Sequence, residues 1–513
     1  MGRFILFAGL CLVAASVASA YNIVCYVNID AQSRTAPWNF DPATHFSGAQ
    51  CTHMVVAYAD IGDSNNLIEQ SAGDTTFYSS VTDLKNSNAD LKVLLAVGGP
   101  GFDATKFSGV ATDANKGTFS TNVISFLRTN QFDGLMLDWR FPETDEKDAF
   151  TALCQQLSDD FDSDTTSGDS LLLGAAVSGD PVLMNDIYDI PALDNHLDFI
   201  NIMAYDFYNV AYGVVRHHAP LSPGILDTQD FAHWNAEDAM IFWRNRGATT
   251  EKLLMGVAAY GRTFTLSSQQ FNDIGASASG TGDAGDYTNE AGLLSYFEIC
   301  SGFPSTQMKW SDEHQVPYAF DGDQWVGYDD AASAELKATF VINYSFGGVA
   351  VWSLDLDDYL GQCSSQAYPI VHGLFTTLEA DVSTITFTTA AETQTTCPSS
   401  DLYRGCVGQE NGQYSVPGYP RCFYNCWDGI AFLQQCPLDL VFNEDCACCD
   451  HDDTNVPTGG TGADFCQNMD DGIYAKTDNP AQYNHCAHGV TYIRDCPQNT
   501  VYSTSCQCCD HAT

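Results

Sequence analysis

An acid and a base stand two residues apart in the stretch FDGLMLDWRFPE at residues 132–143. If this stretch ends a buried strand, Asp138 and Arg140 point to one face, because side chains along a strand alternate between its faces. Leu137 and Trp139 then point to the opposite, apolar face. Opposite charges at this spacing on one face can form a hydrogen-bonded ion pair. We therefore predict that Arg140 and Asp138 pair inside a cleft.

Polar and aromatic residues also follow three other apolar runs. Tyr205 and Asp206 follow one run, Arg262 follows a second, and Trp352 ends a third. Aromatic faces stack on pyranose rings and polar groups fix sugar hydroxyls and amides, so these residue types suit a sugar. The alternative, that Tyr205, Asp206 and Trp352 are inherited barrel structure only, stays open at this point.

The elements that position these residues are eight short apolar runs. Near-continuous apolar strands are typical of a parallel sheet covered by helices, and helical spacing at Phe119, Val123 and Leu127 indicates one such helix. Eight βα units predict an α/β fold, a (β/α)8 TIM barrel, whose functional groups lie at the carboxyl ends of the strands. The gap before the last run is too long for one helix, so we expect an α+β insertion at about residues 263–330 between strand seven and strand eight. The runs are 22–28, 52–58, 91–97, 132–138, 171–177, 198–204, 253–259 and 348–353.

Changes in composition divide the chain into parts. Arg3, an apolar run and Ala18-Ser19-Ala20 are typical of a secretory signal peptide at residues 1–20, so we expect a secreted, extracellular protein. No later run is long and apolar enough to predict a membrane span. The further predicted parts are the barrel at 21–380, a threonine-rich linker at 381–396, a first module at 397–452, a second linker at 453–463 and a second module at 464–513.

The tail is rich in cysteine. Of twenty cysteines, fourteen lie at or beyond Cys397, and a set of six recurs at an offset of sixty residues. Such short modules need disulfides to fold, so we expect two small disulfide-rich β modules rather than metal sites, and no cofactor. Cys397 and Cys422 have no counterpart in the second module, and we predict that they pair with each other.

Aromatic residues in the tail are candidates for binding a polysaccharide surface. Trp427 lies in the first module and Tyr483 in the second. Two linked modules would gain avidity on an insoluble polymer. The alternative, that these side chains form the small cores of the modules, stays open.

The net charge of −45 argues against nucleic acid and anionic membranes as partners. The acidic residues are dispersed and lack the spacing of an EF-hand. Solubility accounts for such a surface, and a weak calcium or mineral association is the alternative.

The first 370 or so residues resemble glycoside hydrolase family 18, which comprises chitinases and chitinase-like lectins. The tail modules resemble peritrophin-type chitin-binding domains, although their cysteine spacing departs from the usual pattern. The resemblance implies chitin or chito-oligosaccharides as partners, with Tyr205, Asp206, Arg262 and Trp352 at sugar-contacting positions beside Asp138. The matching pieces are CTHMVVAYADI, KVLLAVGG, FDGLMLDWRFP, NIMAYDF, EKLLMGVAAYGRTFTL, EAGLLSYFEIC, QWVGYDD and GVAVWSLDLDD.

The same resemblance implies a pattern of cysteine pairing in the barrel. It predicts the disulfides Cys25–Cys51 and Cys300–Cys363, and it leaves Cys154 as a buried free thiol.

The family signature DGxDxDWExP reads DGLMLDWRFP here. In the family, the glutamate protonates the glycosidic oxygen, and the acid two residues earlier orients the substrate's N-acetyl group, which attacks the anomeric carbon. Arg140 occupies the glutamate position and Met136 the central acid position, so only Asp138 remains of these three. Arginine, with a pKa above ~12, releases no proton, and losing a general acid costs about 10²–10⁴ in rate. The resemblance therefore implies an inactive relative of the chitinases rather than an enzyme.

Two alternative functions stay open: a weakly active chitinase that uses a non-standard acid such as Glu143, and a growth-factor-like signalling protein. The turn after Pro142 should carry Glu143 away from the barrel axis. Two aromatic platforms usual in the family are missing, because VNIDAQ follows the first strand and GGPGF, with Pro100, follows the third. We expect a matrix-associated lectin that binds chitin mainly through its tail.

Overall fold

The structure is a computed structural model that describes residues 21–384, except 167, 225–226 and 228, together with ten short strands between residues 412 and 511. The predicted signal peptide at 1–20, the predicted linker from residue 385 and the linker at 453–463 lie outside the described residues. No helix in the described part of the chain is both long enough and apolar enough to span a bilayer.

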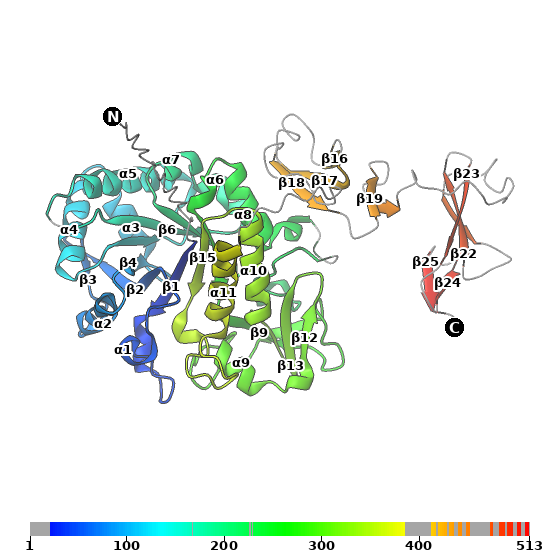
Figure 1. Cartoon of the computed structure of the whole chain (residues 1–513), viewed down its shortest axis with the longest axis horizontal. Helices are drawn as coiled ribbons and strands as arrows, with labels where there is room; N and C mark the ends of the chain where they lie inside the picture. Colours follow the sequence, from blue (N-terminus) through cyan, green and yellow to red (C-terminus); the bar gives the residue numbers. More distant parts are fainter. Residues whose placement is uncertain are drawn as a thin grey trace, which may run out of the picture. The chain divides into compact units, whose positions relative to one another are not determined.

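The main sheet closes into a barrel of parallel strands, because β1 pairs with both β15 and β2 (Figure 1). All eight apolar runs fall on barrel strands, so the predicted TIM barrel is confirmed. One short antiparallel strand, β3 (Asn66–Ile68), extends β2 at its far end. The barrel strands are β1 (Asn22–Asn28), β2 (His53–Gly62), β4 (Lys92–Gly98), β5 (Gly134–Asp138), β6 (Leu172–Ser178), β7 (Phe199–Met203), β8 (Leu253–Ala258) and β15 (Gly348–Trp352).

Helices cover the outside of the barrel, where they bury one apolar stripe each. In α4, Phe119, Val123 and Leu127 are fully buried, as their helical spacing predicts. Asp103, Asp180 and Asn235 each cap a helix by accepting a hydrogen bond from a backbone N–H of its first turn. The helices are α1 (Pro42–His45), α2 (Asp74–Thr82), α3 (Ala104–Val110), α4 (Lys116–Thr129), α5 (Lys147–Ser163), α6 (Pro181–Ile187), α7 (Ile190–Asp194), α8 (Ala236–Asn245), α9 (Tyr296–Gly302), α10 (Ala331–Asn343) and α11 (Pro369–Thr384).

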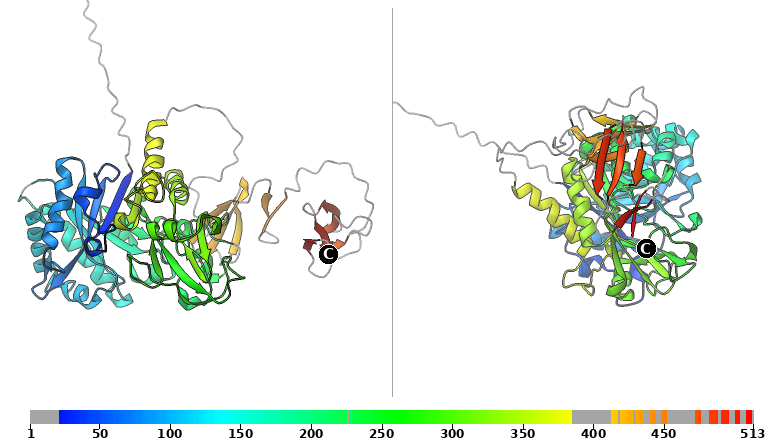
Figure 2. Two further views of the ribbon diagram at one scale, coloured as in Figure 1. Left: turned by 90° about the horizontal axis from the view of Figure 1, so that it is seen from below. Right: turned by 90° about the vertical axis from the view of Figure 1, so that its right-hand side faces the viewer.

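A six-stranded antiparallel sheet is inserted between the last two barrel strands, and it carries α9. Figure 2 shows this green sheet from two further sides. It has its own small core, in which the Trp325 ring stacks on Tyr318 with centroids 5.6 Å apart and meets Phe264 at 5.7 Å. Its strands are β9 (Tyr260–Leu266), β10 (Ala278–Thr281), β11 (Leu293–Ser295), β12 (Met308–Ser311), β13 (Val316–Asp321) and β14 (Gln324–Gly327).

Two disulfides staple the barrel and its insertion. Cys25–Cys51 joins β1 to the segment just before β2, and Cys300–Cys363 joins α9 to the segment after β15. Both pairs are those that the family resemblance predicts. Cys154 is a buried free thiol, and burial raises the pKa of this thiol.

The tail consists of short antiparallel sheets. Among the described residues, each module has one three-stranded and one two-stranded sheet, so the predicted β modules are confirmed. Cys422 is in a disulfide, whereas Cys397 lies outside the described residues, so their pairing stays a prediction. The strands are β16 (Gly412–Val416), β17 (Tyr419–Trp427), β18 (Ile430–Gln435), β19 (Leu440–Asn443), β20 (Cys448–His451), β21 (Gly472–Ala475), β22 (Gln482–Ala487), β23 (Val490–Asp495), β24 (Thr500–Ser503) and β25 (Cys508–His511).

The fully buried Lys337 ties α10 both to Asp329, just before the helix, and to the loop that follows β7. Lys337 Nζ lies 2.6 Å from Asp329 Oδ2 and donates to the Ala219 carbonyl oxygen at 2.9 Å. Neither charged side chain is exposed to solvent. A buried charge is tolerated only when it is paired, so removing either Lys337 or Asp329 should destabilise the fold by leaving the other charge unpaired.

We predict that Lys337→Met lowers the free energy of unfolding by about 3–5 kcal/mol, because it leaves the Asp329 carboxylate buried and unpaired. Urea denaturation measures this change. The matched control is Asp329→Leu/Lys337→Met, which removes both charges and should recover most of the loss. A single variant as stable as the wild type would contradict the prediction.

Candidate functional site

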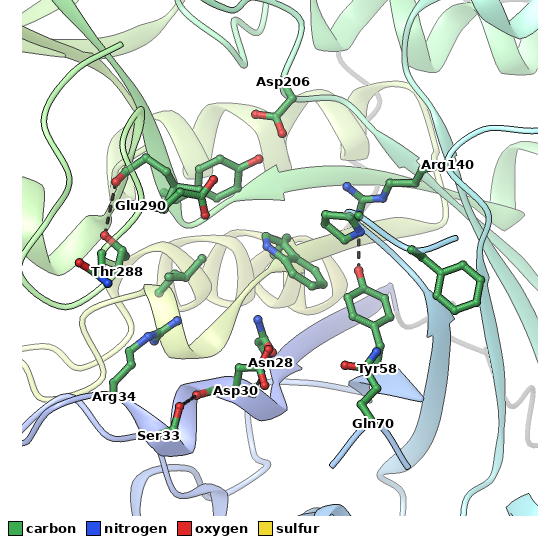
Figure 3. Close-up of a pocket in the computed structure, with 18 of the residues that line it drawn as sticks. Asn28, Asp30, Ser33, Arg34, Tyr58, Gln70, Arg140, Asp206, Thr288 and Glu290 are labelled. Atoms are coloured by element: carbon green, nitrogen blue, oxygen red, sulfur yellow. Dashed lines mark hydrogen bonds between the residues drawn. The ribbon is translucent and has the colours of Figure 1, made fainter. Parts of the chain in front are cut away.

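A cleft of about 1120 Å³ opens at the carboxyl ends of the barrel strands, where a TIM barrel carries its functional groups. Figure 3 shows Arg140 and Tyr58 on one side of it and Thr288 and Glu290, from the insertion, on the other. Of the residues singled out from the sequence, those whose side chains line the cleft are Arg140, Tyr205, Asp206, Arg262 and Trp352.

The ion pair that the sequence predicts is present at the end of β5. Arg140 Nε donates to Asp138 Oδ1 at 2.7 Å, and Arg140 Nη2 donates to Asp138 Oδ2 at 2.9 Å. The Tyr58 hydroxyl donates to the same Oδ2 at 2.7 Å. The Asp138 side chain is 1% exposed, whereas that of Arg140 is 20% exposed. Both oxygens of the carboxylate are therefore occupied by protein donors.

Two glycines at the end of β4 make room for this arrangement. A Cβ on Gly98 would lie 2.1 Å from the Asp138 carbonyl oxygen, and a Cβ on Gly99 would lie 2.4 Å from the Tyr58 ring. Both residues also have positive φ, at 108° and 89°, which favours glycine. The β4 end can thus approach β5 closely only because side chains are absent there.

The groups around Asp138 are held in fixed protonation states. Burial opposes the charge on Arg140, but the Asp138 carboxylate outweighs it and raises the pKa of the guanidinium. Burial, with the added charge of Asp138, also raises the pKa of the Tyr58 hydroxyl well above its ordinary value. Neither group can release a proton near neutral pH, so neither serves as a general acid.

Two other positions could have held a general acid, Met136 and Glu143. Neither of them places an acidic side chain in the cleft. Met136 is fully buried on β5 and carries no titratable group. Glu143 is exposed, does not line the cleft and forms a capping box with Glu146 at the start of a short 3-10 helix. The chain after Pro142 thus carries Glu143 away from the site, as expected from the sequence.

A second ion pair lies on another wall of the cleft. Arg262 Nε and Nη2 donate to the two oxygens of Asp206, each at 2.7 Å, and His218 Nδ1 lies 3.3 Å from Asp206 Oδ1. Burial would raise the pKa of Asp206, but the hydrogen bonds from Arg262 and His218 outweigh it and hold this pKa well below its usual range. No pattern in the sequence predicts that His218 contacts Asp206.

Trp352 forms an aromatic surface in the cleft at the end of β15. Its ring stacks on Tyr58 with centroids 5.6 Å apart and packs against Tyr26 at 5.3 Å. Where the family usually has further aromatic platforms, Asp30 and Pro100 line the cleft instead. The apolar area offered to a sugar ring is correspondingly smaller.

The tail residues singled out from the sequence lie on strands. Trp427 ends β17 and Tyr483 lies in β22, but their side chains are outside the described residues. Their role in binding therefore stays a prediction.

A closed (β/α)8 barrel with a cleft at the carboxyl ends of its strands is the architecture of the TIM-barrel enzymes and their relatives. Residues 22–357 match Glycosyl hydrolases family 18, and residues 406–457 and 466–513 each match the Chitin binding Peritrophin-A domain. The chain therefore belongs to glycosyl hydrolases family 18 and carries two peritrophin-A domains.

Similar proteins include enzymes and a non-enzyme. Chitotriosidase-1 of Mus musculus is 38% identical over 452 residues, which is 84% of this chain and 95% of that protein. The immunomodulatory active chitinase TsES1 of Trichuris suis has a TM-score of 0.67 at 34% identity, covering 70% of this chain and 100% of its own. Human YKL-39, a pseudo-chitinase with retained chitooligosaccharide binding properties, has a TM-score of 0.67 at 35% identity with the same coverage. Family membership alone thus leaves catalysis undecided.

We predict that Arg262→Met reduces stability at neutral pH and that this effect shrinks as the pH falls. A carboxylate with a depressed pKa contributes stability above its unfolded pKa, about 4, and loses it as the pH falls toward its folded value. Urea denaturation of the wild type and variant at several pH values measures the difference. With Asp206→Asn as the background, the same substitution should show no such pH dependence. A difference that stays constant down to acid pH would contradict the assignment.

Proposed function

We propose that this protein is a secreted, chitin-binding member of the family that does not hydrolyse chitin. The observation that carries the proposal is the bidentate pair of Arg140 with Asp138, at the position where the family holds its general acid. Its setting would be a chitin-containing extracellular matrix, to which the tail attaches it.

The chemistry of the cleft supports the loss of hydrolysis. Cleavage of a glycosidic bond needs a group that protonates the leaving oxygen and a charge arrangement that tolerates positive charge on the sugar. Arg140 supplies a permanent cation instead, and Met136 removes a second acid. Asp138, which in the family orients the N-acetyl group, accepts hydrogen bonds from Arg140 and Tyr58 with both oxygens. The general acid and the central acid of the family signature are therefore absent, and the carboxylate that would orient the N-acetyl group is already occupied.

The two peritrophin-A domains support binding to chitin through the tail. Linked modules raise the effective concentration of the second contact once the first is made, so weak sites can give firm retention on an insoluble polymer. We propose Trp427 and Tyr483 as contacting residues in the two modules. The barrel would then be a scaffold or a weaker lectin.

Specific observations favour the two alternatives to a lesser degree. The likeness to chitotriosidase-1 and to TsES1 favours residual chitinase activity, and the immunomodulatory description of TsES1 favours a signalling role. A weak calcium or mineral association rests on the acidic composition alone, since no group of three or more His, Cys, Asp or Glu in the described part of the chain could hold a metal ion.

We predict that the wild type releases no product from soluble N-acetylglucosamine oligomers and that Met136→Asp/Arg140→Glu gains measurable turnover. Restoring a general acid should raise the rate to at least about 10²-fold above the detection limit that bounds the wild type. Product analysis by chromatography measures this. The variant Met136→Asn/Arg140→Gln has similar shapes without the acids and should stay inactive. If the wild type shows turnover and Glu143→Gln does not, the proposal is wrong and the alternative of a weakly active chitinase that uses Glu143 is supported.

We predict that retention on insoluble chitin depends on the tail and not on the cleft. The full chain should sediment with chitin, Trp427→Ala/Tyr483→Ala should remain largely in the supernatant, and Trp352→Ala should sediment like the wild type. A sedimentation assay with quantified supernatant measures this. Loss of retention in Trp352→Ala alone would show instead that the barrel cleft is the main binder.

A further inference from the structure

The positive charges that line the cleft are all engaged by carboxylates. Each of its four basic side chains forms an ion pair. In three of the pairs the cation contacts both carboxylate oxygens, and in the fourth Arg34 also donates to the backbone carbonyl oxygen of Asp355. The pairs are Arg34 with Asp355 at 2.7 Å, Lys106 with Asp60 at 2.6 Å, Arg140 with Asp138 at 2.7 Å and Arg262 with Asp206 at 2.7 Å.

Several carboxylates of the cleft, by contrast, have no such partner. Asp30 and Asp286 are exposed and have no side-chain hydrogen bond or ion pair within the described residues. Glu290 is 62% exposed, and its only cation within reach is Arg262 at 3.9 Å, which already holds Asp206. Figure 3 places Asp30 and Glu290 in different parts of the pocket wall. The unneutralised charge of the cleft is therefore negative and spread along it.

The inner end of the cleft has also lost its acceptor for an acetamide group. In the family, the acid at the Asp138 position orients the N-acetyl group of the sugar. Here Asp138 accepts three hydrogen bonds, from Arg140 Nε, Arg140 Nη2 and the Tyr58 hydroxyl, and it is 1% exposed. Freeing one oxygen for a ligand would leave part of a buried ion pair unsatisfied, which is costly. An N-acetyl group therefore finds no acidic acceptor at this position.

We propose that the barrel cleft prefers deacetylated glucosamine units over N-acetylglucosamine units, and so takes partly deacetylated chitin as its ligand. Glucosamine carries an ammonium group where N-acetylglucosamine carries a neutral amide. The ammonium groups of successive units offer positive charge and hydrogen-bond donors to Asp30, Asp286 and Glu290 along the cleft, while one sugar ring stacks on Trp352. The inference rests on the proposed function, in which the protein binds polymers of the chitin type.

The test compares the binding of soluble glucosamine oligomers and N-acetylglucosamine oligomers of equal length, by isothermal titration in a mildly acidic buffer of low salt. Every chain in the test, including the one with the wild-type cleft, is full length and carries Trp427→Ala/Tyr483→Ala, so that the proposed tail contacts do not contribute. Three exposed charge pairs of ordinary strength would favour the glucosamine oligomer by about tenfold. The cleft variant Asp30→Asn/Asp286→Asn/Glu290→Gln should lose this preference, and high salt should reduce it in the wild type.

The matched control is Asp145→Asn/Asp159→Asn/Asp312→Asn, which removes three exposed acids outside the cleft and should keep the preference of the wild type. Tighter binding of the N-acetylglucosamine oligomer, or a preference that the control loses as fully as the cleft variant, would overturn the inference. So would isotherms that are identical in the wild type and the cleft variant. Retention on insoluble chitin and the absence of hydrolysis are measured separately, so this inference can fail while the proposed function holds.

Discussion

The ion pair between Arg140 and Asp138 contributes to the stability of the barrel and also determines which groups its cleft offers to a ligand. The Asp138 side chain is almost fully buried, and a buried carboxylate needs a cation or several donors to remain charged. Arg140 supplies the cation and two hydrogen-bond donors, one to each carboxylate oxygen, and the Tyr58 hydroxyl supplies a third donor. Losing the partner of a buried charge costs about 3–5 kcal/mol, so the site cannot simply release this carboxylate to a substrate. The glycines at the end of β4 and the stacking of Tyr58 on Trp352 hold the same three groups in place.

The rest of the cleft follows the same physical pattern. In a second bidentate pair, Arg262 donates to both oxygens of Asp206, and His218 also contacts the Asp206 carboxylate. The cleft has a volume of about 1120 Å³ and a Trp352 surface, but Asp138 and Asp206, at the strand ends, are engaged by arginines. Such a cavity can hold a ligand by shape, stacking and exposed charge, while an arginine occupies the family's general-acid position. In this account, the tail supplies attachment and the barrel adds selectivity.

Much of this arrangement could be predicted from sequence because it depends on local periodicity. Eight apolar runs locate the barrel strands, and the two-residue spacing of Asp138 and Arg140 predicts their pairing, since both facts follow from alternation along a strand. Tyr58 could not be predicted as the third partner, because it is 80 residues from Asp138 and reaches it only through the order of strands in the barrel. His218 was missed for a similar reason, since its partner Asp206 is brought near by a loop whose path no periodicity encodes. The pairing of Lys337 with the loop after β7 likewise exists only in the folded chain.

The most direct measurement is a crystal structure of the chain with an N-acetylglucosamine oligomer bound in the barrel cleft. The account predicts that Asp138 keeps both hydrogen bonds from Arg140 and the one from Tyr58, and that the sugar lies over Trp352 without a contact to Asp138. A structure in which Asp138 leaves Arg140 and accepts a hydrogen bond from the acetamide N–H would contradict it, because the carboxylate would then be free to orient the substrate.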